Sequence, residues 1–289
     1  MPRIVIFAEA RDWHGRRLAQ ALRASGATVA TRSLASCGFA LGGAGSGIVI
    51  PNEAELPDAV LVKTVASGSF EQVTLRLSLL HALDRLGVIV INDARAIERC
   101  VDKAMTSFLL HRAGIPIPST LATEDGVWAA QAIAASKTDL VQKPLFGSQG
   151  RDLARIAPGG APPPAEPYAG VHYLQQFVGR QSGWQDYRVM VVGGTPVAAM
   201  QRRGTSWITN VHRGARCEAI EMSRGLAELS IGAVEAVGAD YAGVDLIEDP
   251  EGRLRVLEVN SMPAWRGLQS VADCDIAERL ARHVLARLG

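Results

Sequence analysis

The sequence predicts an α/β protein that begins with a parallel sheet and continues into α+β units. Two observations favour this class. Short apolar segments alternate with helix-like segments in the first third of the chain, and turn signals join apolar segments in the last third. In addition, aromatic residues make up only 5% of the chain, while small aliphatic residues and 29 glycines are frequent. This composition suits layered helices and sheets better than an aromatic-rich sandwich.

Length and charge narrow the class further. The 289 residues suffice for one large domain or two to three small ones, and 48% hydrophobic with 20% charged residues argues against disorder. A net charge of +1 provides no overall attraction to nucleic acids or anionic membranes. The apolar run at residues 4–7 is too short for a signal peptide, and the uncharged segment 33–52 is too rich in glycine to span a membrane. We therefore expect a cytoplasmic protein with no membrane and no nucleic-acid partner.

The first unit, residues 1–92, alternates strands and helices. The expected elements, in order, are strand 4–7, helix 14–25, strand 28–31, strand 59–62, helix 69–86 and strand 88–91. Gly26 and Gly87 follow the two helices at the position where helices commonly end. Consecutive strands joined by helices favour a parallel sheet with right-handed crossovers, which is a Rossmann-like arrangement.

The second and third units, residues 93–172 and 173–289, combine helices with antiparallel strands. The second is expected to contain helix 94–113, strand 139–144, loop 146–150, strand 153–156 and the proline-rich connector 157–167. The third is expected to contain strands 173–178, 187–192 and 196–201, helix 223–237, strands 243–248 and 254–260, and a final amphipathic helix. Gly193-Gly194 predicts a tight hairpin between two of these strands.

Acidic side chains occupy two neighbouring apolar strands near the C-terminus. Asp245 lies in one strand, and Glu258 and Asn260 lie two residues apart in the next. Because strand side chains alternate, Glu258 and Asn260 share a face. Two carboxylates and an amide oxygen form a donor set suited to Mg²⁺ or Mn²⁺. The alternative is a pair of polar positions on a solvent-facing hairpin, but the apolar surroundings favour a metal site.

A lysine, Lys143, precedes the glycine-rich loop 146–150, in which backbone N–H groups can approach phosphate oxygens. The Lys-Ser/Thr ending of a Walker A loop is missing. A basic stretch follows, with Arg202, Arg203, His212, Arg213 and Arg216 around Trp207. It suits RNA, a small polyanion or a solvated hairpin, and the balanced overall charge disfavours RNA. The four cysteines are scattered, so we expect free thiols.

Taken together, these residues resemble the ATP-grasp superfamily, and within it the RimK-like glutamate ligases. The motifs that carry the resemblance occur in a consistent order, namely 102–106, 113–118, 142–150, 175–178, 186–188, 202–203, 209–214, 242–245 and 257–263. The resemblance implies an ATP-grasp fold, in which an N-terminal Rossmann-like domain precedes two α+β subdomains that grip a nucleotide. Segments 68–73 and 263–269 are similar to ligases of tetrahydromethanopterin and methanofuran cofactors.

The resemblance also implies residue roles. ATP would be bound by Lys103, Lys143, Gly147, Ser148, Gln149, Gly150, Gln176, Phe177, Val178, Asp186 and Asn210. Catalysis would involve Arg188, Arg203 and Arg213, and two Mg²⁺ or Mn²⁺ ions would be held by Asp245, Glu258 and Asn260. Two positions depart from the family pattern, because Gln176 replaces a common Glu and Ile208 replaces a common Arg. The proline-rich connector replaces a helix, which implies a trimmed central domain.

The implied activity is ATP-dependent amide formation through an acyl phosphate. The partners would be an amino acid, most simply glutamate, and a small-molecule acceptor, and related ligases form homodimers or homotetramers. A ligase that modifies a protein or carrier protein and a non-catalytic nucleotide-binding module remain alternatives. The complete acidic set of Asp245, Glu258 and Asn260 argues against the module, which has no need to hold metal ions.

Overall fold

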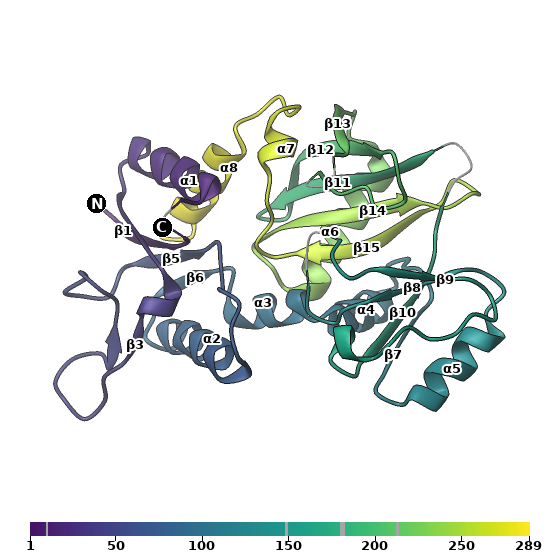
Figure 1. Ribbon diagram of the computed structural model, residues 1–289. Coiled ribbons are helices and arrows are strands. Elements are labelled where there is room, and N and C mark those ends of the chain that lie inside the picture. Colours follow the sequence, from purple (N-terminus) through teal and green to yellow (C-terminus); the bar gives the residue numbers. More distant parts are fainter. Residues whose placement is uncertain (10, 148–149, 180–182, 212–213) are drawn as a thin grey trace.

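The computed structural model describes residues 1–9, 11–147, 150–179, 183–211 and 214–289. Within these ranges the chain forms two four-stranded sheets, one five-stranded sheet and a small two-stranded hairpin. Figure 1 shows the first sheet on the left and the other two stacked on the right. No helix in the described ranges is long and apolar enough to cross a lipid bilayer.

The first sheet is parallel, with the strand order β2-β1-β5-β6. Its elements are β1 (Arg3–Phe7), α1 (Trp13–Ala24), β2 (Thr28–Arg32), β5 (Ala59–Val62), α2 (Phe70–Arg85) and β6 (Ile89–Ile91). All four residues of β5 are buried, as expected of a strand that is covered on both faces. The predicted alternation of strands and helices is confirmed. The uncharged segment forms a short 3-10 turn (Leu34–Ser36) and a hairpin of β3 (Gly38–Phe39) and β4 (Ile48–Val49).

The helix predicted over residues 94–113 is two helices, α3 (Ala94–Val101) and α4 (Lys103–Arg112). Asp102 has extended backbone angles, and its side chain accepts hydrogen bonds from the N–H groups of Ala104 and Met105. It therefore caps α4. The apolar spacing along 94–113 spans this break, which is why the pattern predicts a single helix. The break places Lys103 at the first residue of α4.

The second sheet has the strand order β7-β10-β8-β9. Its elements are β7 (Thr120–Thr123), α5 (Gly126–Ala135), β8 (Leu140–Lys143), β9 (Ala154–Ile156), a 3-10 turn (Glu166–Tyr168) and β10 (His172–Gln176). Neither β7 nor α5 is predicted from the sequence. Because β10 pairs with β7 and β8, this strand belongs to the second sheet. The division of the chain at residues 172/173 stays a prediction.

The third sheet is antiparallel, with the order β13-β12-β11-β14-β15. Its strands are β11 (Trp184–Val192), β12 (Thr195–Gly204), β13 (Arg216–Ala219), β14 (Tyr241–Glu248) and β15 (Leu254–Asn260). The helices of this part are α6 (Arg224–Val237), α7 (Arg266–Gln269) and α8 (Ile276–Ala286). The hairpin at Gly193-Gly194 is confirmed, and both residues have the positive φ that tight turns require.

The C-terminal helix joins the first and third sheets. Ile276, Leu280 and Val284 of α8 share one core with Ile4 and Leu18 of the first unit, and this core extends to the third sheet. Figure 1 shows α8 beside α1, close to the N-terminus. The last helix of the chain therefore completes the core of the first unit.

A buried lysine lies at the same junction. Lys63 follows β5, and its Nζ donates a hydrogen bond to the carbonyl oxygen of Pro263 at 2.8 Å. The ammonium also lies 4.4 Å from the ring centroid of Trp265. Desolvation lowers the pKa of Lys63 to about 7, against the opposing attraction of Asp12.

This environment predicts that stability depends on pH through Lys63. Between about pH 10 and pH 7 the unfolded chain takes up a proton at Lys63 that the folded chain does not. As pH falls through this window, the free energy of unfolding of the wild type should decrease by about 1.4 kcal/mol per pH unit relative to that of Lys63→Met. Below pH 7 the difference in unfolding free energy between the two proteins should become constant. Denaturant unfolding of both proteins at each pH measures it, and parallel pH profiles would show that Lys63 does not titrate there.

Candidate active site

A cavity of about 150 Å³ lies between the second and third sheets. It is lined by residues of β8, β10, β11, β12, β14 and β15 and of the segments that follow β8, β10 and β12. The structure brings together here many residues that the sequence predicts to act, namely Lys143, Gly150, Gln176, Phe177, Val178, Asp186, Asn210, Asp245 and Glu258. These residues lie up to 115 positions apart in the chain, so the fold creates the site.

The acidic end of the cavity is formed by the paired strands β14 and β15. Asp245 lies directly opposite Glu258, and Gly243 lies opposite Asn260. A register shift after Asp245 marks a β-bulge, a feature that changes the direction of side chains locally. The intervening Val259 is buried on the other face of the sheet. The predicted sharing of one face by Glu258 and Asn260 therefore agrees with the strand pairing.

Two arginines from the neighbouring strands neutralise this acidic end. Arg188 binds Asp245 with two hydrogen bonds of 2.6 Å, from Nε and Nη2. Arg202 binds Asp186 in the same two-fold manner at 2.6 Å and reaches Asp245 at 3.1 Å. Thr209 donates a further hydrogen bond to Asp186 at 2.7 Å. The result is a nearly buried network of two carboxylates and two guanidinium groups.

The network sets opposite pKa shifts on its two carboxyl groups. Desolvation raises the pKa of Asp186, because Arg202 is shared with Asp245 and does not fully compensate. Desolvation also acts on Asp245, but Arg188 and Arg202 outweigh it and hold the pKa of Asp245 below its ordinary value. Asp245 therefore remains ionised, which a carboxylate ligand of a cation requires.

The donor set at this end fits a hard divalent cation. Asp245, Glu258 and Asn260 offer carboxylate and amide oxygens, the ligands that Mg²⁺ and Mn²⁺ prefer. In the described ranges no three His, Cys, Asp or Glu side chains cluster closely enough to enclose a metal ion by themselves. Mg²⁺ is commonly held by one or two carboxylates together with substrate phosphates. The structure thus agrees with an open site that a nucleotide completes.

Two lysines approach the cavity from the side of the second sheet. The Nζ of Lys143 donates to Gln175 Oε1 at 2.6 Å, and Lys103 Nζ donates to the carbonyl oxygen of Gly147 at 2.9 Å. Desolvation lowers the pKa of Lys143 to about 8. The negative charge of Glu258 opposes this shift, and the positive charge of Lys103 adds to it. Desolvation likewise lowers the pKa of Lys103. Two desolvated ammonium groups next to a glycine-rich loop favour a polyanionic ligand.

Some predicted residues lie elsewhere. Arg203 does not line the cavity, because its Nε donates to Glu218 on β13 at 2.7 Å and both side chains are exposed. Side chains alternate along β12, so the preceding residue, Arg202, faces the cavity instead. Ser148, Gln149 and Arg213 lie outside the described residues. Arg202 lies directly opposite Asp186 in the paired strands β11 and β12. The sequence alone does not specify this register, so it does not distinguish Arg202 from Arg203.

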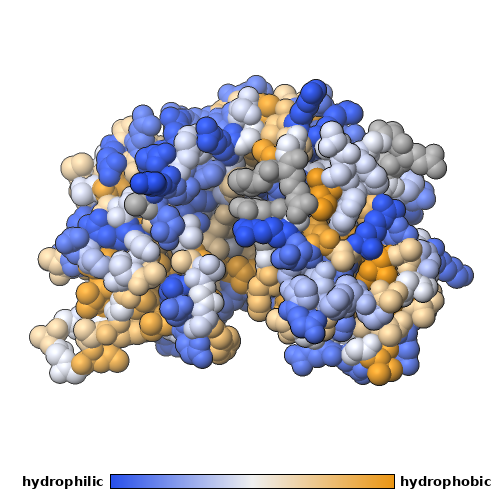
Figure 2. Space-filling view, in the orientation of Figure 1, coloured by the Kyte–Doolittle hydropathy of each residue, from blue (hydrophilic) through white to orange (hydrophobic). Residues whose placement is uncertain are grey.

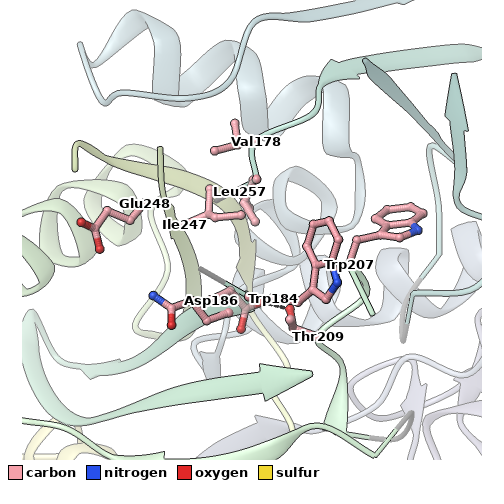
Figure 3. Close-up of a pocket in the computed structure, with 11 residues that line it drawn as sticks. Val178, Trp184, Asp186, Trp207, Thr209, Ile247, Glu248 and Leu257 are labelled. Atoms are coloured by element: carbon pink, nitrogen blue, oxygen red, sulfur yellow. Dashed lines mark hydrogen bonds between the residues drawn. The ribbon is translucent and has the colours of Figure 1, made fainter. Parts of the chain in front are cut away.

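The other end of the cavity is apolar and aromatic. Phe177 contacts Trp184 and Trp207 edge-on, with centroid distances of 6.0 and 5.9 Å. A smaller pocket of about 60 Å³ is lined by Trp184, Trp207, Ile247 and Leu257, among others. Figure 3 shows these side chains. Both cavities share several lining residues, including Val178 and Thr209. Sequence reasoning missed Trp184, Ile247 and Leu257, since isolated apolar residues in strands do not distinguish a cavity wall from a core.

The site therefore has one apolar end and one charged end. Flat apolar walls suit a nucleobase, while lysines and a carboxylate pair suit phosphates with a divalent cation. Comparison with known proteins agrees with this geometry, because residues 100–284 match the RimK-like ATP-grasp domain. The chain belongs to the RimK-like ATP-grasp family. It is an ATP-grasp ligase, and the ATP-grasp fold predicted from the sequence is confirmed.

Relatives with curated names support membership of the RimK-like family. The chain is 38% identical over 224 residues to a tetrahydromethanopterin:alpha-L-glutamate ligase of Methanococcus maripaludis, covering 72% of this chain and 75% of the relative. It is 31% identical over 260 residues to the protein of the same name from Methanosarcina acetivorans, covering 78% and 79%.

Solved structures agree with the fold. The ATP-grasp ligase PsnB, solved with a phosphomimetic variant of its minimal precursor, Mg and ADP, aligns with a TM-score of 0.76 at 23% identity, over 99% of this chain and 98% of PsnB. A RimK domain ATP-grasp protein of Sphaerobacter thermophilus aligns with a TM-score of 0.68 at 22% identity, over 97% and 98%. At these identities the likeness concerns the fold alone.

Proposed function

We propose that this ligase adds L-glutamate to a small-molecule coenzyme of one-carbon metabolism, of the tetrahydromethanopterin or methanofuran type. The observation that carries the proposal is the cavity itself, which is lined by Lys143 and by the acidic pair of Asp245 and Glu258. Arg188 neutralises Asp245, and Lys103 lies beside the glycine-rich loop. The names of the relatives at 38% and 31% identity support glutamate as the amino acid and the pterin coenzyme as the acceptor.

In the proposed reaction, a carboxylate oxygen of the acceptor attacks the γ-phosphorus of ATP. The bond from phosphorus to the β–γ bridging oxygen breaks, which releases ADP and leaves an acyl phosphate. The amine of glutamate then attacks the acyl carbon, loses a proton, and displaces phosphate to form the amide. No residue of the chain has to form a covalent bond, so catalysis rests on positioning and on charge neutralisation.

The residues of the cavity divide this work. Lys103 and Lys143 would neutralise phosphate oxygens, and the segment Gln176–Val178 with Ile247 would hold the adenine. Asp245, Glu258 and Asn260 would hold Mg²⁺, as two ions, and a bound Mg²⁺ would withdraw negative charge from the phosphates. The structure of PsnB with Mg and ADP supports both ligands for this fold. Arg188, fixed by Asp245, would stabilise the charge that develops at the transferred phosphoryl group.

Departures from the family pattern bear on substrate choice. The side chain of Gln176 offers an amide oxygen where a carboxylate is common. The backbone N–H of Gln176 donates to the carbonyl oxygen of Ser119 at 2.8 Å. Ile208 lines the cavity and supplies no charge there.

Phosphate release from ATP tests the proposal. We expect release with Mg²⁺ only when glutamate and tetrahydromethanopterin or methanofuran are both present, with the amide detected by mass spectrometry. Matched reactions replace glutamate by other amino acids, or the coenzyme by a protein fraction. A requirement for the protein fraction would favour a protein-modifying ligase instead. Nucleotide binding without phosphate release under every condition would contradict a ligase function. Gel filtration of the same preparation tests the predicted homodimer or homotetramer.

A further inference from the structure

Three side chains of the first unit hold the backbone next to the acidic strands. They are His14 in the first turn of α1, Lys63 after β5 and Asn92 after β6. Each belongs to the carboxyl-end edge of the parallel sheet, and each bonds to main-chain atoms of the third unit. The segment they approach, residues 261–266, begins directly after Asn260 and is called the 261–266 turn below.

His14 contacts the far end of this turn. Its Nε2 accepts hydrogen bonds from the backbone N–H groups of Trp265 at 3.1 Å and Arg266 at 3.3 Å. Its Nδ1 lies 3.0 Å from Asp12 Oδ1. Although desolvation acts in the other direction, bonds from His14 and Gly15 lower the pKa of Asp12 to about 2. The ionised carboxylate can only accept, so Nδ1 carries the hydrogen and Nε2 carries the free electron pair.

Asn92 contacts the near end of the turn, and its side chain is fully buried. Its Nδ2 donates to the carbonyl oxygens of Tyr241 at 2.7 Å and Ser261 at 2.6 Å. Its Oδ1 accepts from the N–H groups of Asp240 at 2.6 Å and Tyr241 at 3.1 Å. With the bond from Lys63 to Pro263, the turn is thus fixed at three points by the first unit.

The 261–266 turn also contacts Arg188 and Gly243 at the acidic end of the cavity. Arg188 Nη1 donates to the carbonyl oxygen of Ala264 at 3.4 Å, in addition to its bonds with Asp245. Gly243, opposite Asn260, lies so close to Pro263 that an added Cβ would be 2.9 Å from Pro263 Cβ. A shift of the turn would therefore displace Arg188 and the end of β15 together.

We propose that His14, oriented by Asp12, is a positioning residue for the ligation. Its Nε2 holds the backbone of Trp265 and Arg266, and through the turn it fixes Arg188 and Asn260 at the reacting end of the nucleotide. The part that concerns catalysis rests on the proposed function. The part that concerns anchoring stands on the hydrogen bonds of His14 alone.

The test compares three variants of the full-length chain. His14→Phe removes the acceptor and keeps a ring beside Trp265, whereas His14→Gln places an amide oxygen near the position of Nε2. His81→Phe is the matched control, because His81 is a half-exposed histidine of the same unit that pairs with Glu98. Hydrogen–deuterium exchange of the Trp265 and Arg266 amides, without any ligand, measures the anchoring directly.

In His14→Phe we expect these two amides to exchange at least about tenfold faster, the factor that corresponds to a lost hydrogen bond. The kcat for ligation should fall by about 100-fold, since small displacements of positioned groups have effects of that order. The Kd for ATP should stay within a few-fold, because the apolar end of the cavity is untouched. His14→Gln should restore slow exchange and most of kcat, and His81→Phe should match the wild type.

Unchanged exchange in His14→Phe would overturn the anchoring, whatever the ligation activity. Faster exchange with unchanged kcat would overturn the positioning role. The positioning role would also be contradicted if His14→Gln kept slow exchange but lost as much kcat as His14→Phe. Absence of ligation by the wild type with every acceptor would refute the proposed function and the catalytic part of this inference, and leave the exchange result to decide the anchoring.

Discussion

Replacing Glu258 by Gln should lower kcat for ligation by about 1000-fold, which corresponds to roughly 4 kcal/mol of lost transition-state stabilisation. Glu258 lies opposite Asp245 at the charged end of the cavity and faces two desolvated lysines. The substitution keeps the shape of the side chain and removes its charge. A divalent cation would then lose one of two anionic ligands, while the apolar end of the cavity would remain intact.

Two measurements separate this loss from misfolding. The Kd for ATP without metal should stay within a few-fold, since Glu258 is not among the residues that line the smaller, aromatic pocket. The denaturation midpoint should stay close to that of the wild type. Glu251→Gln is the matched control, because Glu251 lies in the exposed turn between β14 and β15 and forms an exposed ion pair with Arg253. Amide formation by Glu258→Gln at near wild-type rates would rule out a metal role for this carboxylate.

Replacing Arg202 by Met should destabilise the fold by about 3–5 kcal/mol, the range found when one partner of a buried ion pair is removed. Arg202 is 4% exposed and neutralises Asp186, which is 6% exposed, and part of Asp245. Without the guanidinium, Asp186 would be left as a buried carboxylate, with Thr209 as its remaining side-chain partner among the described residues. The pKa of Asp186, which desolvation already raises, should rise further.

The adjacent residue provides the control. Arg203→Met removes an exposed ion pair with Glu218, which should change stability by less than about 1 kcal/mol. Denaturant unfolding at pH 7 of both variants measures the difference. Loss of stability by the Arg202 variant should shrink as pH falls, because protonation of Asp186 removes the unpaired charge. Similar destabilisation by both substitutions would contradict the assignment of Arg202 to the buried network.

The elements that sequence reasoning predicts well are those with local signals. The strands around Asp245 and Glu258 are short apolar segments with a turn between them, and the shared face of Glu258 and Asn260 follows from the period of two within β15. The alternating strands and helices of residues 1–92 are similarly local. Here each segment carries its own pattern, and the tertiary structure agrees with it.

The elements that were missed depend on long-range pairing. Residues 120–123 form a strand because β10, about fifty positions later, pairs with them. Helix α5 is apolar on several sides, so it has no clear amphipathic period. The ion pair of Arg202 with Asp186 depends on the register of β11 and β12. The sequence shows two adjacent arginines, and only the register determines which one faces the cavity.

The position of α8 has a consequence for biosynthesis. The first sheet is synthesised early, but Ile276, Leu280 and Val284 of α8 supply part of the core beside Ile4 and Leu18. On a ribosome, residues 1–92 would therefore keep apolar surface exposed until residues 276–286 have emerged. We expect the nascent N-terminal unit to bind chaperones that recognise apolar segments, and to be protected from proteases only when residues 276–286 have been added.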